Sequence, residues 1–153
     1  MKTEHQTRVE AFMKLAGQAV PTCPIIPSLE VRWLRANLIL EEALETIEGL
    51  GFSLRMKPFD NEFELQETLT PDIVEVVDGC ADISVVTTGT LSAFGVADIP
   101  ILETVDAANL RKFGPGSYRR ESDGKWMKPP DFVPPDIMQL LLEQGYRSGK
   151  AVS

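Results

Sequence analysis

Two long segments, residues 29–50 and 70–94, constrain the fold most, because each has helix start and stop signals around a long apolar pattern. Ser28 is the predicted N-cap of the first segment. Thr70 is the predicted N-cap of the second, with Pro71 at its first helical position. Glycines end both segments, and strands do not alternate with helices along the chain. This pattern predicts an all-α bundle.

Shorter elements flank the two segments. Residues 6–18 show the apolar spacing of another helix, and a further helix is predicted to begin at Asp98 and to end at Gly114. The stretch "VPTCPIIP" contains three prolines, which predicts an extended connector. Residues 52–69 alternate loosely, so both a short hairpin and an irregular excursion are open.

The C-terminal part, residues 114–153, is polar and rich in proline. It is predicted to contain a turn at "SDGK", an extended stretch at "KPPDFVPPD" and a short helix at "IMQLLLEQGY". We expect one domain over residues 1–153, with a core at 28–113 and a tail at 114–153. The tail is predicted to lie across the surface of its own or another subunit.

Composition excludes several classes of protein. The formal net charge of −8 argues against nucleic-acid binding, which depends on basic surface. The sequence contains no run of eighteen apolar residues, so no membrane span is predicted. The N-terminus is polar and lacks the apolar region of a secretory signal, and Cys23 and Cys80 lack metal-site spacing. We therefore expect two reduced thiols in a cytoplasmic protein.

The first long segment carries acid beside its apolar side. Residues three and four apart share a helix face, so Glu41, Glu42 and Glu45 form a cluster at the edge of the predicted buried side. Such a row of like charges costs stability unless something compensates it. A solvated acidic face is the simplest explanation of this turn taken alone. Beside this acidic cluster, the same helix carries an apolar stripe that is predicted to pack in the core: Trp33, Leu40, Leu44 and Ile47.

The second long segment repeats this arrangement. Glu75, Asp78 and Asp82 are spaced i, i+3 and i+7, and the same stripe continues into Val85. Two facing acidic patches would repel each other unless divalent cations lay between them, and Mg²⁺ and Mn²⁺ prefer carboxylate and water oxygens. His5 is the only histidine, which argues against zinc and against the Glu-x-x-His pattern of di-iron sites.

EExxE followed by ExxD resembles the signature of the all-α nucleoside triphosphate (NTP) pyrophosphohydrolases, a superfamily that includes MazG. The stretches "VEVVDGCADISVVTTGTLSAFGV", "VDAANLRKFGPG" and "DGKWMKPPDFVPPDI" are similar to MazG-like proteins of phages and bacteria. The resemblance covers about residues 30–138. It implies a MazG-like helical bundle in which the EExxE and ExxD helices face each other.

The chain departs from the family pattern at three points. The interval between the motifs, residues 46–74, is slightly long, which we attribute to the excursion at 52–69. Ala108 stands where the motif NNLxKF has its first Asn. Asp82 lies one turn beyond Asp78, and the MazG register makes Asp82 the equivalent of the motif Asp. Literal spacing favours Glu75 and Asp78, and Asp82 is kept as a further ligand.

The resemblance implies cleavage of an NTP between its α- and β-phosphates, giving a nucleoside monophosphate and pyrophosphate. Glu41 is expected to orient or deprotonate the attacking water. The cofactor is expected to be Mg²⁺ or Mn²⁺, with two or more ions per site. The expected metal ligands are Glu42, Glu45, Glu75, Asp78 and Asp82.

Asn109 and Lys112, an N-x-x-K pair on one helix face, are the first candidates to contact the pyrophosphate. Lys112 near a helix C-terminus is alternatively explained by the helix dipole. Trp33 is a candidate for stacking on the base, although an apolar Trp on a helix is more often a core residue. Trp126, in the polar tail, is expected to face a ligand or a neighbouring subunit. The second group of substrate candidates lies in the tail: Arg120, Lys125 and Lys128.

The resemblance also implies a homodimer or homotetramer with the active site near the subunit contact. Some viral members act on dGTP, so a purine dNTP such as dGTP is the first substrate to test, although the sequence does not fix the base. One alternative is a non-catalytic helical module that binds metal or a basic partner. Another is phosphoribosyl-ATP pyrophosphohydrolase, against which the phage-like tail motifs argue.

Overall fold

The structure is a computed structural model that describes residues 1–56 and 63–147. The middle of the expected excursion and the end of the tail lie outside the described residues. Within these limits the chain is mostly helical, which confirms the all-α prediction. The helices are α1 (Glu4–Leu15), α2 (Leu29–Gly49), α3 (Ile73–Ala93), α4 (Asp98–Leu110) and α5 (Ile137–Glu143). Two antiparallel strand pairs accompany them: β1 (Phe52–Met56) with β2 (Phe63–Glu67), and β3 (Tyr118–Arg119) with β4 (Trp126–Met127).

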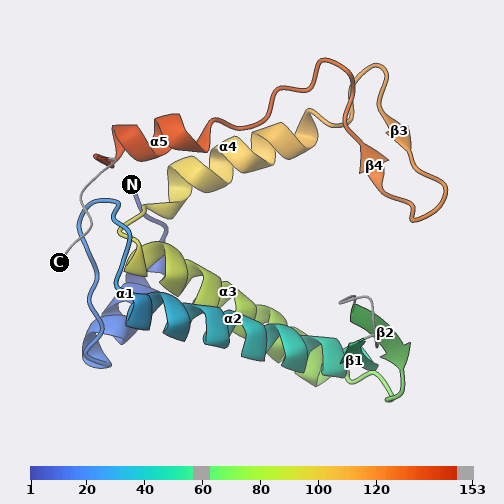
Figure 1. Cartoon of the computed structure of the whole chain (residues 1–153), viewed down its shortest axis with the longest axis horizontal. Helices are drawn as coiled ribbons and strands as arrows, with labels where there is room; N and C mark the ends of the chain where they lie inside the picture. The colour runs from blue at the N-terminus through green and yellow to red at the C-terminus, as the bar shows by residue number, and fades with distance from the viewer. Residues whose placement is uncertain (57–62, 148–153) are drawn as a thin grey trace.

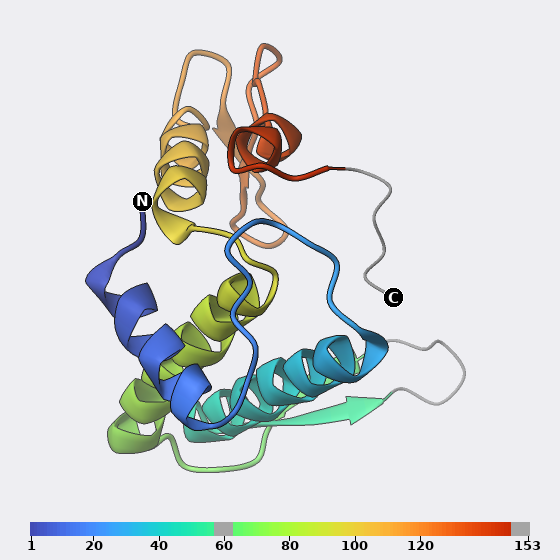
Figure 2. The same cartoon turned by 90° about the vertical axis from the view of Figure 1, so that its left-hand side faces the viewer.

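The helices form two layers (Figures 1 and 2). In the lower layer of Figure 1, α2 and α3 lie side by side and antiparallel, and α1 packs against α3. In the other layer, α5 packs against α4. The buried apolar core is small and centres on Val9, Met13 and Ala93, where α1 meets the C-terminal half of α3.

No single described helix is long and apolar enough to cross a membrane. Taken together, α3 and α4, which meet at a bend of 119°, reach the length and apolar composition of a membrane span. Cys23 and Cys80 are exposed and carry free thiols.

The helix caps follow the predictions at α2 and differ at α3. The Ser28 hydroxyl accepts a hydrogen bond from the backbone N–H of Val31, which confirms the predicted N-cap of α2. The prediction of Thr70 and Pro71 as the start of α3 is wrong. Asp72 is the N-cap, because its carboxylate accepts from the N–H of Val74 while its own N–H donates to the Gly49 carbonyl. The second contact ties the start of α3 to the end of α2.

The structure also decides two expectations about the segments that follow α2 and α4. The segment 52–69 contains the β1–β2 hairpin arms, with Phe52 opposite Glu67. Helix α4 ends at Leu110, earlier than the predicted end at Gly114, because the chain leaves the helix in successive turns over residues 111–116.

The predicted core stripe of α2 is partly wrong. Trp33 is 67% exposed and Leu40 is 55% exposed. The side of α2 that meets α3 instead carries Arg35, Thr46 and Gly49, which are buried. This pairing leaves the apolar stripe turned away from α3, although its other two members, Leu44 and Ile47, are half-buried.

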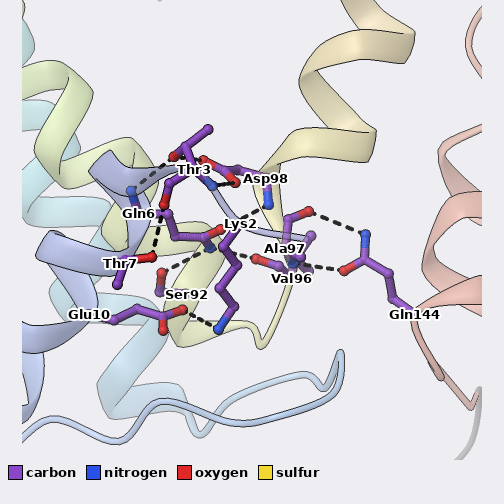
Figure 3. Close-up of polar contacts among 10 residues, drawn as sticks. All are labelled: Lys2, Thr3, Gln6, Thr7, Glu10, Ser92, Val96, Ala97, Asp98 and Gln144. Carbon is purple, nitrogen blue, oxygen red and sulfur yellow. Dashed lines mark hydrogen bonds and ion pairs between the residues drawn. The ribbon is translucent and has the colours of Figure 1, made fainter.

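A buried polar network holds the turn between α3 and α4 (Figure 3). The Gln6 side chain is fully buried, donates to the Ser92 hydroxyl at 3.1 Å and the Val96 carbonyl at 2.7 Å, and accepts from the Asp98 N–H at 2.9 Å. The Asp98 carboxylate in turn accepts from the backbone N–H and the hydroxyl of Thr3. Helix α1 therefore fixes the point from which α4 departs.

The same turn is also held from the C-terminal side. The Gln144 side chain, which follows α5, accepts from the N–H of Ala97 at 2.7 Å and donates to the Ala97 carbonyl at 3.2 Å (Figure 3). Elements from both ends of the chain therefore meet at the α3–α4 turn.

Candidate active site

Two glycines set how closely α2 and α3 pack. A Cβ atom on Gly79 would overlap the Thr46 hydroxyl oxygen and lie 3.1 Å from the Thr46 Cα. Closer to the hairpin, a Cβ atom on Gly49 would lie 3.0 Å from the Glu75 Cβ. The two antiparallel helices therefore approach each other almost backbone to backbone, and their register is fixed.

This register places Glu42 across from Asp82. Glu42 lies four residues before Thr46 on α2, and Asp82 lies three residues after Gly79 on the antiparallel α3. Both side chains are half-buried. The Thr46 hydroxyl also donates to the Glu42 carbonyl at 2.7 Å, which fixes the backbone at this turn.

Glu42 is the centre of a cluster of carboxylates. Its pKa is raised above the ordinary value of a glutamate, first by partial burial and then by repulsion from Asp82, Glu45, Glu41 and Asp78. Of these four charges, Asp82 on the opposite helix contributes most. The predicted EExxE residues are thus brought together with two acids of α3.

The α3 acids differ in position. Asp82 acts on Glu42 more strongly than Asp78 does, which fits the alternative register that makes Asp82 a ligand. Glu75 lies beside Gly49, one turn toward the hairpin end of the pair. The cluster is thus centred one turn farther along α3 than literal ExxD spacing indicates, and the ligand roles stay predictions.

The donor set of the cluster fits a hard divalent cation. Carboxylate oxygens are the preferred ligands of Mg²⁺ and Mn²⁺, and no Lys or Arg among the described residues forms an ion pair with any of these acids. No three described carboxylate, thiol or imidazole side chains already converge tightly enough to hold an ion. Side-chain rotation would have to bring the oxygens together, and Glu41, Glu45 and Asp78 are exposed and free to rotate.

The predicted pyrophosphate contacts lie on the other layer. The Lys112 ammonium donates to the Asn109 side-chain oxygen at 2.7 Å, so the N-x-x-K pair forms as expected. Helix α4, which carries Asn109, packs against α5 rather than along α2 and α3. The structure of one chain therefore does not bring this pair to the acidic cluster.

The tail cations occupy three different settings. Arg120 forms a two-point ion pair with Asp123, which raises the pKa of Arg120 and lowers that of Asp123. The Lys125 backbone N–H also donates to Asp123, at 3.1 Å. The Lys128 ammonium lies 4.8 Å from the centroid of the Phe132 ring, a cation–π distance. Asp123 engages Nε and Nη2 of Arg120, which leaves Nη1 as the main donor that could contact a phosphate.

A family model described as phosphoribosyl-ATP pyrophosphohydrolase matches residues 9–109. The match covers about two thirds of the chain, from α1 almost to the end of α4 and across both acidic motifs. The chain belongs to this family. No curated protein matches the sequence significantly.

Membership of the phosphoribosyl-ATP pyrophosphohydrolase family confirms the resemblance to the MazG-like all-α superfamily. The protein is therefore a pyrophosphohydrolase of a nucleotide, a hydrolase that acts on an acid anhydride. The matching family is one of the alternatives that the sequence left open. The tail beyond residue 109, on which the phage-like assignment depended, lies outside the match.

Sequence reasoning missed Arg35, which is buried on the α2 face that meets α3. Its guanidinium donates to the Gln18 side chain, while its Nε has no hydrogen-bond partner among the residues that the structure describes. Burial lowers the pKa of Arg35. Its guanidinium lies beside Gly89, where a Cβ atom would be 3.0 Å from Nη1. An arginine seven residues before Glu42, and thus on the same helix face, was the available sequence signal.

Proposed function

We propose that this family member is a metal-dependent nucleoside triphosphate pyrophosphohydrolase that cleaves between the α- and β-phosphates. The supporting observation is the carboxylate cluster around Glu42, whose pKa is raised and whose members have no ion-pair partner among the described residues. A triphosphate is itself an anion, so it binds such a surface only when cations lie between the two. The cluster therefore supports a metal-bound phosphate substrate.

The residues have distinct proposed roles. Glu42, Glu45, Asp78 and Asp82 would hold Mg²⁺ or Mn²⁺, with Glu75 as an outer ligand. When bound, the metal polarises phosphoryl oxygens and neutralises their charge. Glu41 is more exposed than Glu42, so it is the carboxylate placed to accept a proton from water. The water oxygen bonds to phosphorus, the bridging P–O bond breaks, and a monophosphate and pyrophosphate leave.

Lys112 and Asn109 are proposed to stabilise the negative charge of the departing pyrophosphate. Because α4 does not pack along α2 and α3, this role requires either movement of α4 or a second copy of the chain. A second copy of the chain would also account for its large solvent-accessible area. The accessible area is 11,033 Å², whereas a compact monomer of 16.9 kDa is expected to expose about 7,700 Å². The excess of about 3,300 Å² lies above the roughly 1,000–2,500 Å² that one chain buries in an ordinary obligate dimer, so it supports burial against other copies of the chain.

The exposed apolar surface indicates where a second copy would bind. On α2, the outer face formed by Leu29, Trp33 and Leu40 is at least half exposed. On α3, Val77 and Ala81 line an apolar hollow of about 530 Å³ that also includes Asp78. A homodimer or homotetramer formed through these faces would place the subunit contact beside the acidic cluster.

A second candidate substrate is phosphoribosyl-ATP, favoured by the description of the matching family model. Release of pyrophosphate is common to both proposals, so a panel of substrates separates them. We would assay pyrophosphate release from the eight common NTPs and dNTPs and from phosphoribosyl-ATP, with Mg²⁺, with Mn²⁺ and with EDTA. Turnover of phosphoribosyl-ATP alone would replace the first proposal by the second, and metal-independent turnover would contradict both.

A further inference from the structure

The β1–β2 hairpin has one apolar face. Directly opposite residues of an antiparallel pair lie on the same face, and successive residues of a strand alternate between the two faces. Because Leu54 pairs with Leu65, one face collects four apolar residues, which we call the apolar hairpin face: Phe52, Leu54, Phe63 and Leu65. The opposite, polar face carries Ser53, Arg55, Glu64 and Gln66.

The apolar hairpin face is not covered within one chain. Phe63 is 65% exposed and Leu65 is 54% exposed. Among the described elements, β1 packs against α2 and β2 pairs with β1. A two-stranded hairpin is marginally stable in water unless its hydrophobic face packs against another element. The described part of one chain does not supply that cover for Phe63 and Leu65.

Backbone hydrogen bonds fix the base of the hairpin to the end of α2. The Gly51 carbonyl accepts from the N–H groups of Thr68 and Leu69, both at 3.2 Å. The Thr68 hydroxyl also donates to the Ser53 hydroxyl oxygen at 3.0 Å. The hairpin therefore extends in a set direction from one end of the α2–α3 pair, and the α3–α4 turn lies at the other end (Figure 1).

The position and charge of the apolar hairpin face do not suit a nucleotide. Helix α2 rises about 10 Å between Glu42 and Gly49, and the hairpin begins only beyond that point. The face carries no Lys or Arg, and the residue opposite Phe52 is an acid, Glu67. An anionic ligand would gain no ion pair here, whereas an apolar protein surface would be complementary.

The amount of exposed surface favours a second copy of the chain as the partner. The chain exposes about 3,300 Å² more than a compact monomer of its mass, and one chain buries up to roughly 2,500 Å² in an ordinary obligate dimer. A dimer contact through α2 and α3 alone therefore leaves roughly 800 Å² uncovered, the area that each partner contributes to a standard interface. Contacts between identical chains are also more apolar than the rest of a protein surface.

We propose that the apolar hairpin face packs against the same face of a second copy around a twofold axis. This contact differs from the one proposed through α2 and α3, and two different twofold contacts per chain close a tetramer. Arg55 and Glu64, on the polar face, then stay in solvent. The hairpin contact adds to the assembly proposed above and does not depend on the catalytic assignment.

Sedimentation velocity of the full-length protein tests the contact. Leu65→Glu places a charge in the apolar hairpin face, and Gln66→Glu, the matched control, places the same charge at the next position of β2 on the polar face. We expect tetramers for the unmodified protein and for Gln66→Glu, and a dimer for Leu65→Glu, because burying an unpaired charge is unfavourable. The double variant Leu40→Glu with Leu65→Glu should be a monomer. A native mass below that of a tetramer, or an unchanged mass for Leu65→Glu, would overturn the proposal.

Cysteine labelling gives a second readout that does not require the contact to be broken. In a background of Cys23→Ser and Cys80→Ser, the variants Leu65→Cys and Glu64→Cys place one thiol on each face of β2, at positions that are both exposed in a single chain. We expect the thiol at position 65 to react with a maleimide about tenfold more slowly than the thiol at position 64, because the second copy covers it. Equal rates would show that the face is open to solvent and would overturn the proposal.

Pyrophosphate release by the same samples reports separately on the proposed function. Release by a protein that fails both assembly tests contradicts only the hairpin contact. A tetramer that is protected at position 65 but releases no pyrophosphate from any substrate of the panel contradicts only the catalytic assignment.

Discussion

Gly79 and Thr46 lie so close that a Cβ atom on Gly79 would overlap the Thr46 hydroxyl oxygen. This contact sets the separation of α2 and α3 about one helical turn from the acidic cluster. The Thr46 hydroxyl also donates to the Glu42 carbonyl, so the close contact and the carboxylate at the centre of the cluster share one turn of α2. Close helix packing is therefore the condition under which Glu42 faces Asp82.

Gly79→Ala should destabilise the protein by about 1–3 kcal/mol, because the new methyl group overpacks the helix contact. Chemical denaturation measures the change. Gly114→Ala is the matched control: its φ is not in the left-handed region and the nearest atom to a new Cβ, the Arg111 carbonyl oxygen, lies 3.7 Å away. The control should be neutral or stabilising by up to about 1 kcal/mol. Equal effects of the two substitutions would contradict the close packing.

Gln6→Ala should cost about 2–4 kcal/mol, because it leaves a cavity and removes partners from Ser92, Val96 and the Asp98 N–H. The measurement is again the free energy of unfolding. Thr7→Ala removes an exposed hydroxyl from the next position of α1 and should change stability by no more than about 0.5 kcal/mol. A small effect at Gln6 would mean that α1 does not hold the α3–α4 turn.

Glu42→Gln should raise the unfolding temperature of the metal-free protein at pH 7. The folded-state pKa of Glu42 is raised, so its ionised form destabilises the fold, and that cost grows as pH rises through this pKa. The benefit of the substitution should shrink as the pH falls toward and below the ordinary glutamate value. Mg²⁺ should stabilise the unmodified protein more than the variant. A lower unfolding temperature for metal-free Glu42→Gln at pH 7 would argue against the crowded cluster.

Leu40→Glu should shift the protein toward a monomer in sedimentation experiments, because it places a charge in the apolar outer face of α2. Leu15→Glu, at the far more exposed end of α1, serves as the control and should keep the oligomer. An unchanged mass for Leu40→Glu would exclude this face as a subunit contact.

The local signals of the sequence predicted most of the helices. Ser28 predicted the start of α2 because an N-cap is a short-range interaction, and the EExxE motif predicted the α2 half of the cluster from helical period alone. The start of α3 was misplaced because Asp72 and Thr70 are both good caps. The deciding contact, from the Asp72 N–H to the Gly49 carbonyl, comes from another helix.

Features that depend on how two helices pair are harder to predict from the sequence. Asp82 acts on Glu42 more strongly than Asp78 does because of the register at Gly79 and Thr46, which no single-helix pattern contains. The sequence predicts Trp33 and Leu40 in the core because an apolar stripe indicates that a face is buried, but it does not indicate against which neighbour. In one chain that face meets solvent, and a second copy is the proposed neighbour.

The most direct test compares pyrophosphate release by Glu42→Gln and Glu48→Gln with that of the unmodified protein. Both residues are glutamates of α2, and Glu48 is exposed and outside the cluster. With Mg²⁺ or Mn²⁺ and the best substrate of the panel, we predict that Glu42→Gln loses activity by about a hundredfold or more while keeping its fold, and that Glu48→Gln stays close to the unmodified rate. Pyrophosphate release by Glu42→Gln at the unmodified rate would contradict the assignment of the active site.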